Sequence, residues 1–163
     1  MLLDSNKLCF NRDDLVRGKC NQIRKGEDIA QEYLRQEYER DIVILRILDR
    51  EKEKFKLPKP YSLNKNISVI NIVTRPEIEI LHILSEGLKE DFERNKRHKK
   101  NLKPSEFCQG YFSTRNKGRI RSVKSAEFVN FMYGEHIDKL IDAIEQYHRN
   151  EQQEAYSLWD LLV

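Results

Sequence analysis

The sequence lacks any long apolar run. No stretch approaches the roughly 18 consecutive apolar residues with which a helix crosses a bilayer. The first residues, Met1 to Lys7, contain no basic segment followed by an apolar one, so they do not resemble a secretion signal. We therefore expect no membrane partner and a cytoplasmic location.

Cysteine and glycine are also scarce. Cys9, Cys20 and Cys108 are odd in number and far apart, which excludes a disulfide framework and a zinc knuckle and fits free thiols in a reducing compartment. No glycines form a G-x-G-x-x-G or G-x-x-x-x-G-K phosphate loop. Local motifs also supply no Ser-His-Asp or His-Cys grouping for nucleophilic catalysis.

Charge is abundant and unevenly distributed. Of the 163 residues 39% are hydrophobic and 35% are charged, with a net charge of +3, which suits one core beneath a highly charged surface. Residues 89–124 contain twelve Lys or Arg and four Asp or Glu, a local balance of +8. The rest of the chain is therefore net acidic. A polyanionic partner would bind at the basic segment.

Hydrophobic patterning predicts the fold class. Runs at 42–48 and 67–73 are rich in β-branched residues, and the first is apolar on both faces, as in an interior strand covered on both sides. Helical spacing precedes the first run at 27–39, and Pro76 with Glu77 begins a helix that we expect to continue to about Arg94. We expect an α/β fold with a small, partly parallel sheet, flanking helices and a helical C-terminal third.

We divide the chain into an α/β portion, 1–100, and a helical portion, 101–163, packed as one domain. Short helices are expected from Pro104 and Ser125, and a longer one over 137–147. The apolar tail, 156–163, would dock on its own core or on a second copy.

Four carboxylates follow the two predicted strands. Asp49 and Glu51 come after the first, and Glu77 and Glu79 after the second. Ligand sites in open α/β sheets lie at the carboxyl ends of strands, and clustered carboxylates bind Mg²⁺ or Mn²⁺. If the strands are parallel neighbours, the four residues form a metal site. The alternative is that they are solvated loop charges and that Glu77 and Glu79 favour a helix N-terminus without any metal.

Two residues inside apolar elements stand out. Arg46 lies in the first predicted strand and either pairs with a carboxylate such as Glu79, contacts a phosphate, or lies on an exposed sheet face. His82 lies within the predicted helix after the second strand, and we expect a packed or partnered core residue rather than a ligand.

Two basic segments, 94–103 and 115–124, flank a short predicted helix and would form one nucleic-acid-binding patch. The alternative is that both segments are solvated helix ends and loops. Tyr111 and Phe112 lie between them and either stack on bases or, together with Phe107, face the core. The residues that we expect to contact the nucleic-acid backbone are Lys96, Arg97, Lys99, Lys100, Arg119 and Arg121.

The order of elements over residues 27–92 resembles the Toprim-like proteins of the RloB type, which are found beside bacterial restriction and abortive-infection systems. Asp49 matches the acidic motif at the end of a strand, and Pro76 with Glu79, or with Glu77, matches the later Pro–Glu helix start. The Glu-Gly motif of the first Toprim strand has no counterpart in residues 1–26, and Glu51 stands for the usual second Asp. The resemblance therefore implies a shortened, divergent or inactive copy.

Two functions follow from these patterns. The first is a divalent-metal-dependent nuclease, or nuclease-like protein, acting on nucleic-acid phosphodiesters in bacterial defence or a mobile element. Asp49, Glu51 and Glu79 would be catalytic, and with Glu77 they would hold Mg²⁺ or Mn²⁺, which activates a water. The second is a non-enzymatic accessory protein that forms a homodimer or binds a protein partner through its C-terminal helices and Trp159.

Overall fold

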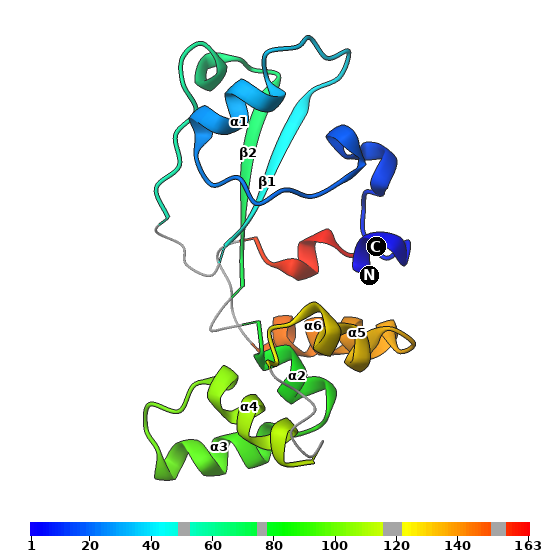
Figure 1. The fold of residues 1–163 in the computed structure, drawn as a ribbon, viewed down its shortest axis with the longest axis vertical. Coiled ribbons are helices and arrows are strands. Elements are labelled where there is room, and N and C mark those ends of the chain that lie inside the picture. Colours follow the sequence, from blue (N-terminus) through cyan, green and yellow to red (C-terminus); the bar gives the residue numbers. More distant parts are fainter. Residues whose placement is uncertain (49–52, 75–77, 116–121, 151–155) are drawn as a thin grey trace.

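The chain adopts an α/β fold in which a small parallel sheet is followed by a group of helices (Figure 1). The computed structural model describes residues 1–48, 53–74, 78–115, 122–150 and 156–163. Short 3₁₀ turns lie near both ends and before the second strand. The main elements are α1 (Gly26–Tyr33), β1 (Ile42–Leu48), β2 (Ile67–Val73), α2 (Ile80–Ser85), α3 (Lys89–His98), α4 (Pro104–Arg115), α5 (Ala126–Tyr133) and α6 (Ile137–Asn150).

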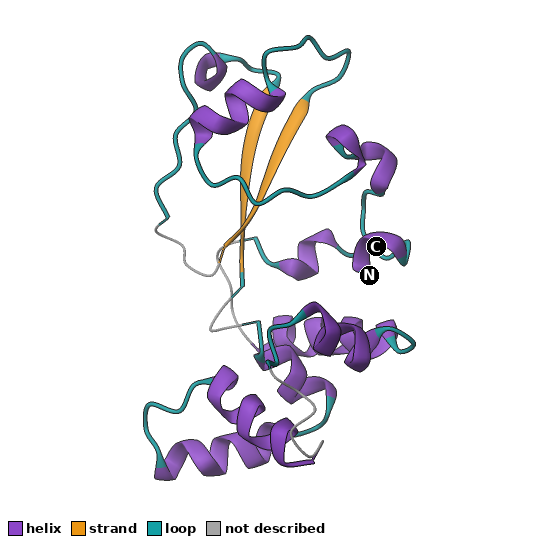
Figure 2. Ribbon diagram, in the orientation of Figure 1, coloured by secondary structure: helices purple, strands orange, loops and turns teal. Residues whose placement is uncertain are grey.

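The sheet of the described residues consists of β1 and β2 alone, paired in parallel. Ile42 is opposite Ile67 at the start and Leu48 is opposite Val73 at the end, which confirms both predicted strands. Figure 2 shows them side by side, running in the same direction. Their carboxyl ends therefore meet at one edge of the sheet, beside the helical part.

The two faces of this sheet are covered unequally. Ile42, Ile44 and Ile67 pack against a small buried cluster that includes residues of α1. On the opposite face, Val43 and Ile47 of β1 are 52% and 61% exposed, whereas Ile72 of β2, which pairs with Ile47, is 1% exposed. The expectation that β1 is covered on both sides is therefore wrong for the described part of the chain, because the covering of this second face does not extend to Val43 and Ile47.

Helix α1 is shorter than the predicted 27–39. It ends at Tyr33, where the hydroxyl of Tyr38 folds back and donates to the Tyr33 carbonyl oxygen at 2.6 Å. That contact satisfies one of the carbonyls left open at a helix end. At the other end of the helix, a Cβ on Gly26 would lie 2.1 Å from the Lys56 carbonyl oxygen, so only glycine permits this close approach of two backbone segments.

The helix expected from Pro76 to Arg94 is divided into α2 and α3. Gly87 has φ +66, a left-handed conformation that glycine adopts without a Cβ clash. The Gly87 N–H donates to the Leu84 carbonyl oxygen at 3.0 Å and the Leu88 N–H donates to that of Ile83 at 2.8 Å. This pair of bonds is a Schellman motif, which ends a helix. The prediction of one continuous helix is therefore wrong.

A second and larger core lies among α2–α6. Phe92 of α3, Cys108 and Phe112 of α4, and Phe128 of α5 all belong to it. The tail, 156–163, packs against this part of the chain, because Trp159 stacks on His148 with ring centroids 5.3 Å apart. Of the two alternatives for the tail, docking on its own chain is the one observed. No helix in the described part of the chain is long and apolar enough to cross a membrane.

Candidate nucleic-acid interface

The two strands of the parallel sheet end side by side. The Thr74 N–H donates to the Leu48 carbonyl oxygen at 2.9 Å, and its hydroxyl donates to the same atom at 3.2 Å. The chain therefore leaves β1 and β2 from neighbouring positions. Asp49, Glu51 and Glu77 lie outside the described residues, so of the predicted metal ligands the structure describes Glu79.

Glu79 is a buried carboxylate beside a lysine. It immediately precedes α2 and is 2% exposed, and its Oε1 lies 3.3 Å from Nζ of Lys124. No hydrogen bond reaches Oε1 within the described residues, so the contact is an ion pair without good hydrogen-bond geometry. Across the described ranges no three His, Cys, Asp or Glu side chains come together. Glu79 therefore faces a cation of the protein itself.

Arg46 is buried and has several partners within the chain. Its guanidinium donates to Asn71 Oδ1 at 3.1 Å, lies 3.6 Å from Glu53 Oε2 and sits 4.2 Å from the centre of the Phe55 ring. The exposed position is therefore not observed, and the carboxylate that pairs with Arg46 is that of Glu53. These contacts fix the guanidinium beside β2 and Phe55.

His82 belongs to a buried polar network, as expected of a partnered core residue. Its Nδ1 lies 2.7 Å from the Tyr133 hydroxyl oxygen, which in turn lies 3.1 Å from Oγ of Ser85. Burial lowers the pKa of His82 to about 4, although a hydrogen bond to the Val123 backbone opposes this shift. Burial also raises the pKa of Tyr133 to about 12. Both groups are neutral near pH 7.

The segment that carries Lys124 is held at Val123. Val123 is 2% exposed within the helical core, and its backbone N–H donates to Gln109 Oε1 of α4 at 3.2 Å. Burial of the side chain and this hydrogen bond together fix the backbone before Lys124. Lys124 then extends from a fixed point toward Glu79.

An open hollow of about 500 Å³ lies between α4 and this segment. Lys99, from the first predicted basic segment, and Lys124, from the second, both line it. Both cations already have partners, since Lys99 Nζ lies 2.8 Å from Glu106 Oε2 and Lys124 pairs with Glu79. The hollow thus joins the two basic segments, while its own lysines are neutralised.

The exposed cations lie next to the hollow, at the end of α3. Lys96, Arg97, Lys100 and Lys103 are exposed, and none forms an ion pair with another described residue. Lys96 lies 5.7 Å above the Phe92 ring. We refer to Lys96, Arg97, Lys100 and Lys103 as the basic turn. Arg119 and Arg121, also predicted to contact the backbone, lie outside the described residues.

The aromatic side chains near the basic turn face inward to different extents. Phe112 is 5% exposed and part of the helical core, so it does not stack on bases. Phe107 and Tyr111 are half-buried and pack against the same core. The expectation that these three side chains face the core is confirmed for Phe112 and partly so for the other two.

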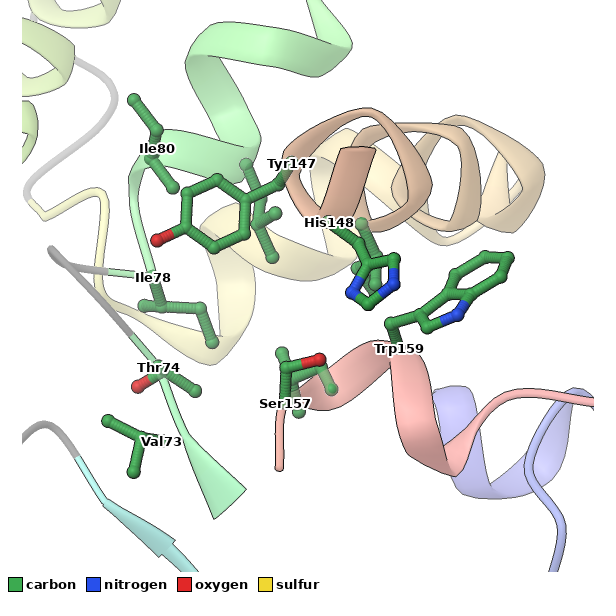
Figure 3. Close-up of a pocket in the computed structure, with 11 residues that line it drawn as sticks. Val73, Thr74, Ile78, Ile80, Tyr147, His148, Ser157 and Trp159 are labelled. Carbon is green, nitrogen blue, oxygen red and sulfur yellow. The ribbon is translucent and has the colours of Figure 1, made fainter. Parts of the chain in front are cut away.

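A recess at the carboxyl end of β2 is too small for an organic ligand. Figure 3 shows Val73 and Ile78 on one side of it and His148 with Trp159 on the other. Its cavity volume is about 20 Å³, which is room for about one water. His148 Nδ1 is buried there without a hydrogen bond to any described residue, and a single water would satisfy it.

Sequence reasoning missed the pairing of Glu79 with Lys124. No local pattern signals an ion pair between residues so far apart in the chain, and it depends on how α2, α4 and α5 pack. The hydrogen bond from Arg46 to Asn71, which crosses from β1 to β2, was missed for the same reason.

Comparison with known proteins adds no relative. No protein family, curated protein or solved structure matches this chain. Its own residues are therefore the only guide to its function.

Proposed function

We propose that the chain binds the phosphate backbone of a nucleic acid through the basic turn. The observation that supports this most directly is the set of exposed cations at Lys96, Arg97 and Lys100, which lack ion pairs with other described residues. Such cations bind phosphates by releasing the counterions that surround a polyanion. The open hollow beside them leaves room for the strand to approach.

The lysines of the hollow differ in how readily they exchange partners. Lys99 and Glu106 are both exposed, and an exposed pair of this kind contributes at most about 1 kcal/mol. A phosphate can therefore replace Glu106. Lys124 faces a buried carboxylate, and its departure would leave that charge uncompensated. Lys124 thus forms part of the scaffold, while Lys99 joins the basic turn in binding.

The test is direct binding with a charge-matched control. The variant K96Q/R97Q/K100Q removes three charges from the basic turn, and R24Q/K54Q/K65Q removes three exposed charges from the α/β part. Fluorescence anisotropy with labelled oligonucleotides at about 50 mM salt should show a loss of tenfold or more for the first variant and little change for the second. Equal losses in both would contradict a localised site.

A metal-dependent nuclease is a second candidate, favoured by the register that ends β1 and β2 side by side at Leu48 and Val73. In this proposal Asp49, Glu51, Glu77 and Glu79 hold Mg²⁺ or Mn²⁺, in agreement with the resemblance to Toprim-like proteins. The metal would supply an activated water for phosphodiester hydrolysis. Of these residues, the described Glu79 by itself does not fit a metal site, because its carboxylate faces Lys124.

Calorimetry separates the two candidates. Titration of the wild type with Mn²⁺ should release or absorb heat that Asp49→Asn and Glu51→Gln lose, while R24Q/K54Q/K65Q retains it. The absence of heat in the wild type would remove the nuclease and leave the binding proposal intact.

A further inference from the structure

A continuous row of contacts runs from the basic turn along α4. Lys96 lies above the Phe92 ring, and Phe92 meets Phe107 edge to face with ring centroids 5.4 Å apart. Phe107 and Tyr111 stack with 6.0 Å between centroids and 20° between planes. The row ends at Arg115, whose guanidinium carbon lies 4.2 Å from the centre of the Tyr111 ring.

Arg115 is well placed to meet a ligand at the end of this row. It is exposed and forms no ion pair with another described residue. Its contact with Tyr111 holds the guanidinium in a defined position, so less side-chain entropy is lost when a ligand binds. A planar guanidinium stacks on nucleobases, which a lysine ammonium cannot do.

The length of α4 separates Arg115 from the basic turn. The helix extends from Pro104 to Arg115, about 16 Å at 1.5 Å per residue. A flexible strand with its phosphates on the basic turn can follow α4 and bring an unpaired base to Arg115. In a duplex the base faces are covered by their neighbours, so a duplex offers the protein its phosphates and base edges.

We infer that the nucleic acid is single-stranded, and that Arg115, held by Tyr111, stacks on a base while the basic turn binds the phosphates. This inference rests on the proposed binding function and adds the class of ligand. Arg115 is a specificity-determining residue in this arrangement, because its guanidinium, held by Tyr111, stacks on the face of an unpaired base, which a base pair within a duplex does not offer. The Phe107–Tyr111 stack maintains its position.

The experiment compares an oligo(dT) of about 15 nucleotides with a duplex of equal length, by fluorescence anisotropy at about 50 mM salt. Wild type should bind the single strand more tightly. Arg115→Lys keeps the positive charge and removes the planar guanidinium. It should therefore weaken single-strand binding roughly tenfold and leave duplex binding unchanged. Thr114→Ala, at a neighbouring exposed position of α4, should bind as the wild type does.

The outcomes distinguish this inference from the binding proposal. Equal affinity of the wild type for both probes, or unchanged single-strand binding by Arg115→Lys, overturns the role of Arg115 and leaves the basic turn as a backbone-binding site. Binding of neither probe overturns both. Because Arg115 is exposed on a helix surface, Arg115→Lys should fold normally, which a thermal melt verifies.

Discussion

The carboxylate of Glu79 lies 3.3 Å from the ammonium nitrogen of Lys124, and the carboxylate is buried while the lysine side chain is 63% exposed. Among the described residues, Lys124 is the cation that compensates a charge which water does not reach. The pair connects the start of α2 to the segment before α5. It also holds Lys124 at the wall of the hollow.

This arrangement predicts unequal effects of the two single substitutions. Lys124→Met leaves a buried negative charge without its cation and should lower the free energy of unfolding by about 1–3 kcal/mol. Glu79→Gln removes the charge and should cost less. In urea titrations the double variant should be more stable than Lys124→Met alone. A double variant less stable than either single one would show that the pair does not act as described.

Stability should also depend on the protonation of His82. The pKa of His82 is lowered to about 4 by burial, whereas in the unfolded chain it is near 6.5. The unfolded state then binds the proton more readily, so the free energy of unfolding falls as the pH drops from 6.5 to 4, by about 3 kcal/mol at most. Above pH 6.5 this contribution is fully present.

The control for His82 is His82→Gln, which cannot titrate. Its free energy of unfolding should be lower near pH 7, because the contact with Tyr133 is altered, but it should change less between pH 6.5 and 4. Parallel pH dependences in the two proteins would show that other groups cause the slope.

Gly87 should resist substitution for a conformational reason. Its φ is +66 and no atom lies within 4 Å of the position where a Cβ would be, so the cost of a side chain there comes from the backbone alone. Gly87→Ala should destabilise the protein by about 1–2 kcal/mol, and Gly87→Asn by less, since asparagine tolerates this conformation. Equal stability of both variants and the wild type would contradict the observed end of α2.

Two paired residues of the adjacent strands give a further comparison. Ile72 of β2 is 1% exposed and Ile47 of β1, its neighbour in the register, is 61% exposed. Ile72→Ala should cost about 2–5 kcal/mol, while Ile47→Ala should cost less than about 1 kcal/mol. Similar losses for both, measured by urea unfolding, would indicate that another layer covers β1 in solution.

Local patterns predicted the strands well because their signals are local. The β-branched runs at 42–48 and 67–73 gave strands with those bounds, and Pro104 begins α4 as expected. The Ser125 side chain accepts from the Phe128 N–H at 3.1 Å, which is the capping bond that a helix start after serine favours. Each of these depends on residues within a few positions of one another.

Other features depend on contacts that periodicity does not report. Apolar residues continue on both sides of Gly87, so their spacing suggested one helix although a glycine that ends it was present. Covering of β1 on both faces was inferred from its apolar pattern, but the described residues leave Val43 and Ile47 of β1 exposed. The ion pair of Glu79 with Lys124 joins distant segments and had no signal in the sequence.

The candidate site was predicted in part. The gathering of basic residues around α4 follows from the sequence, and the structure shows Lys99 and Lys124 at one hollow. The sequence did not show which cations already have partners. In the structure Lys99 pairs with Glu106 and Lys124 pairs with Glu79. The proposed binding function therefore rests on Lys96, Arg97 and Lys100 beside the hollow rather than on the lysines that line it.

The salt dependence of nucleic-acid binding tests the role of the basic turn most directly. For the wild type and an oligo(dT), the logarithm of the binding constant should fall linearly with the logarithm of salt concentration, with a slope of about −2 to −3 for three or four neutralised phosphates. In K96Q/R97Q/K100Q the slope should become shallower by about 2, while R24Q/K54Q/K65Q keeps the wild-type slope. Two results would contradict binding through these residues: a wild-type binding constant that does not change with salt concentration, or an unchanged slope in K96Q/R97Q/K100Q.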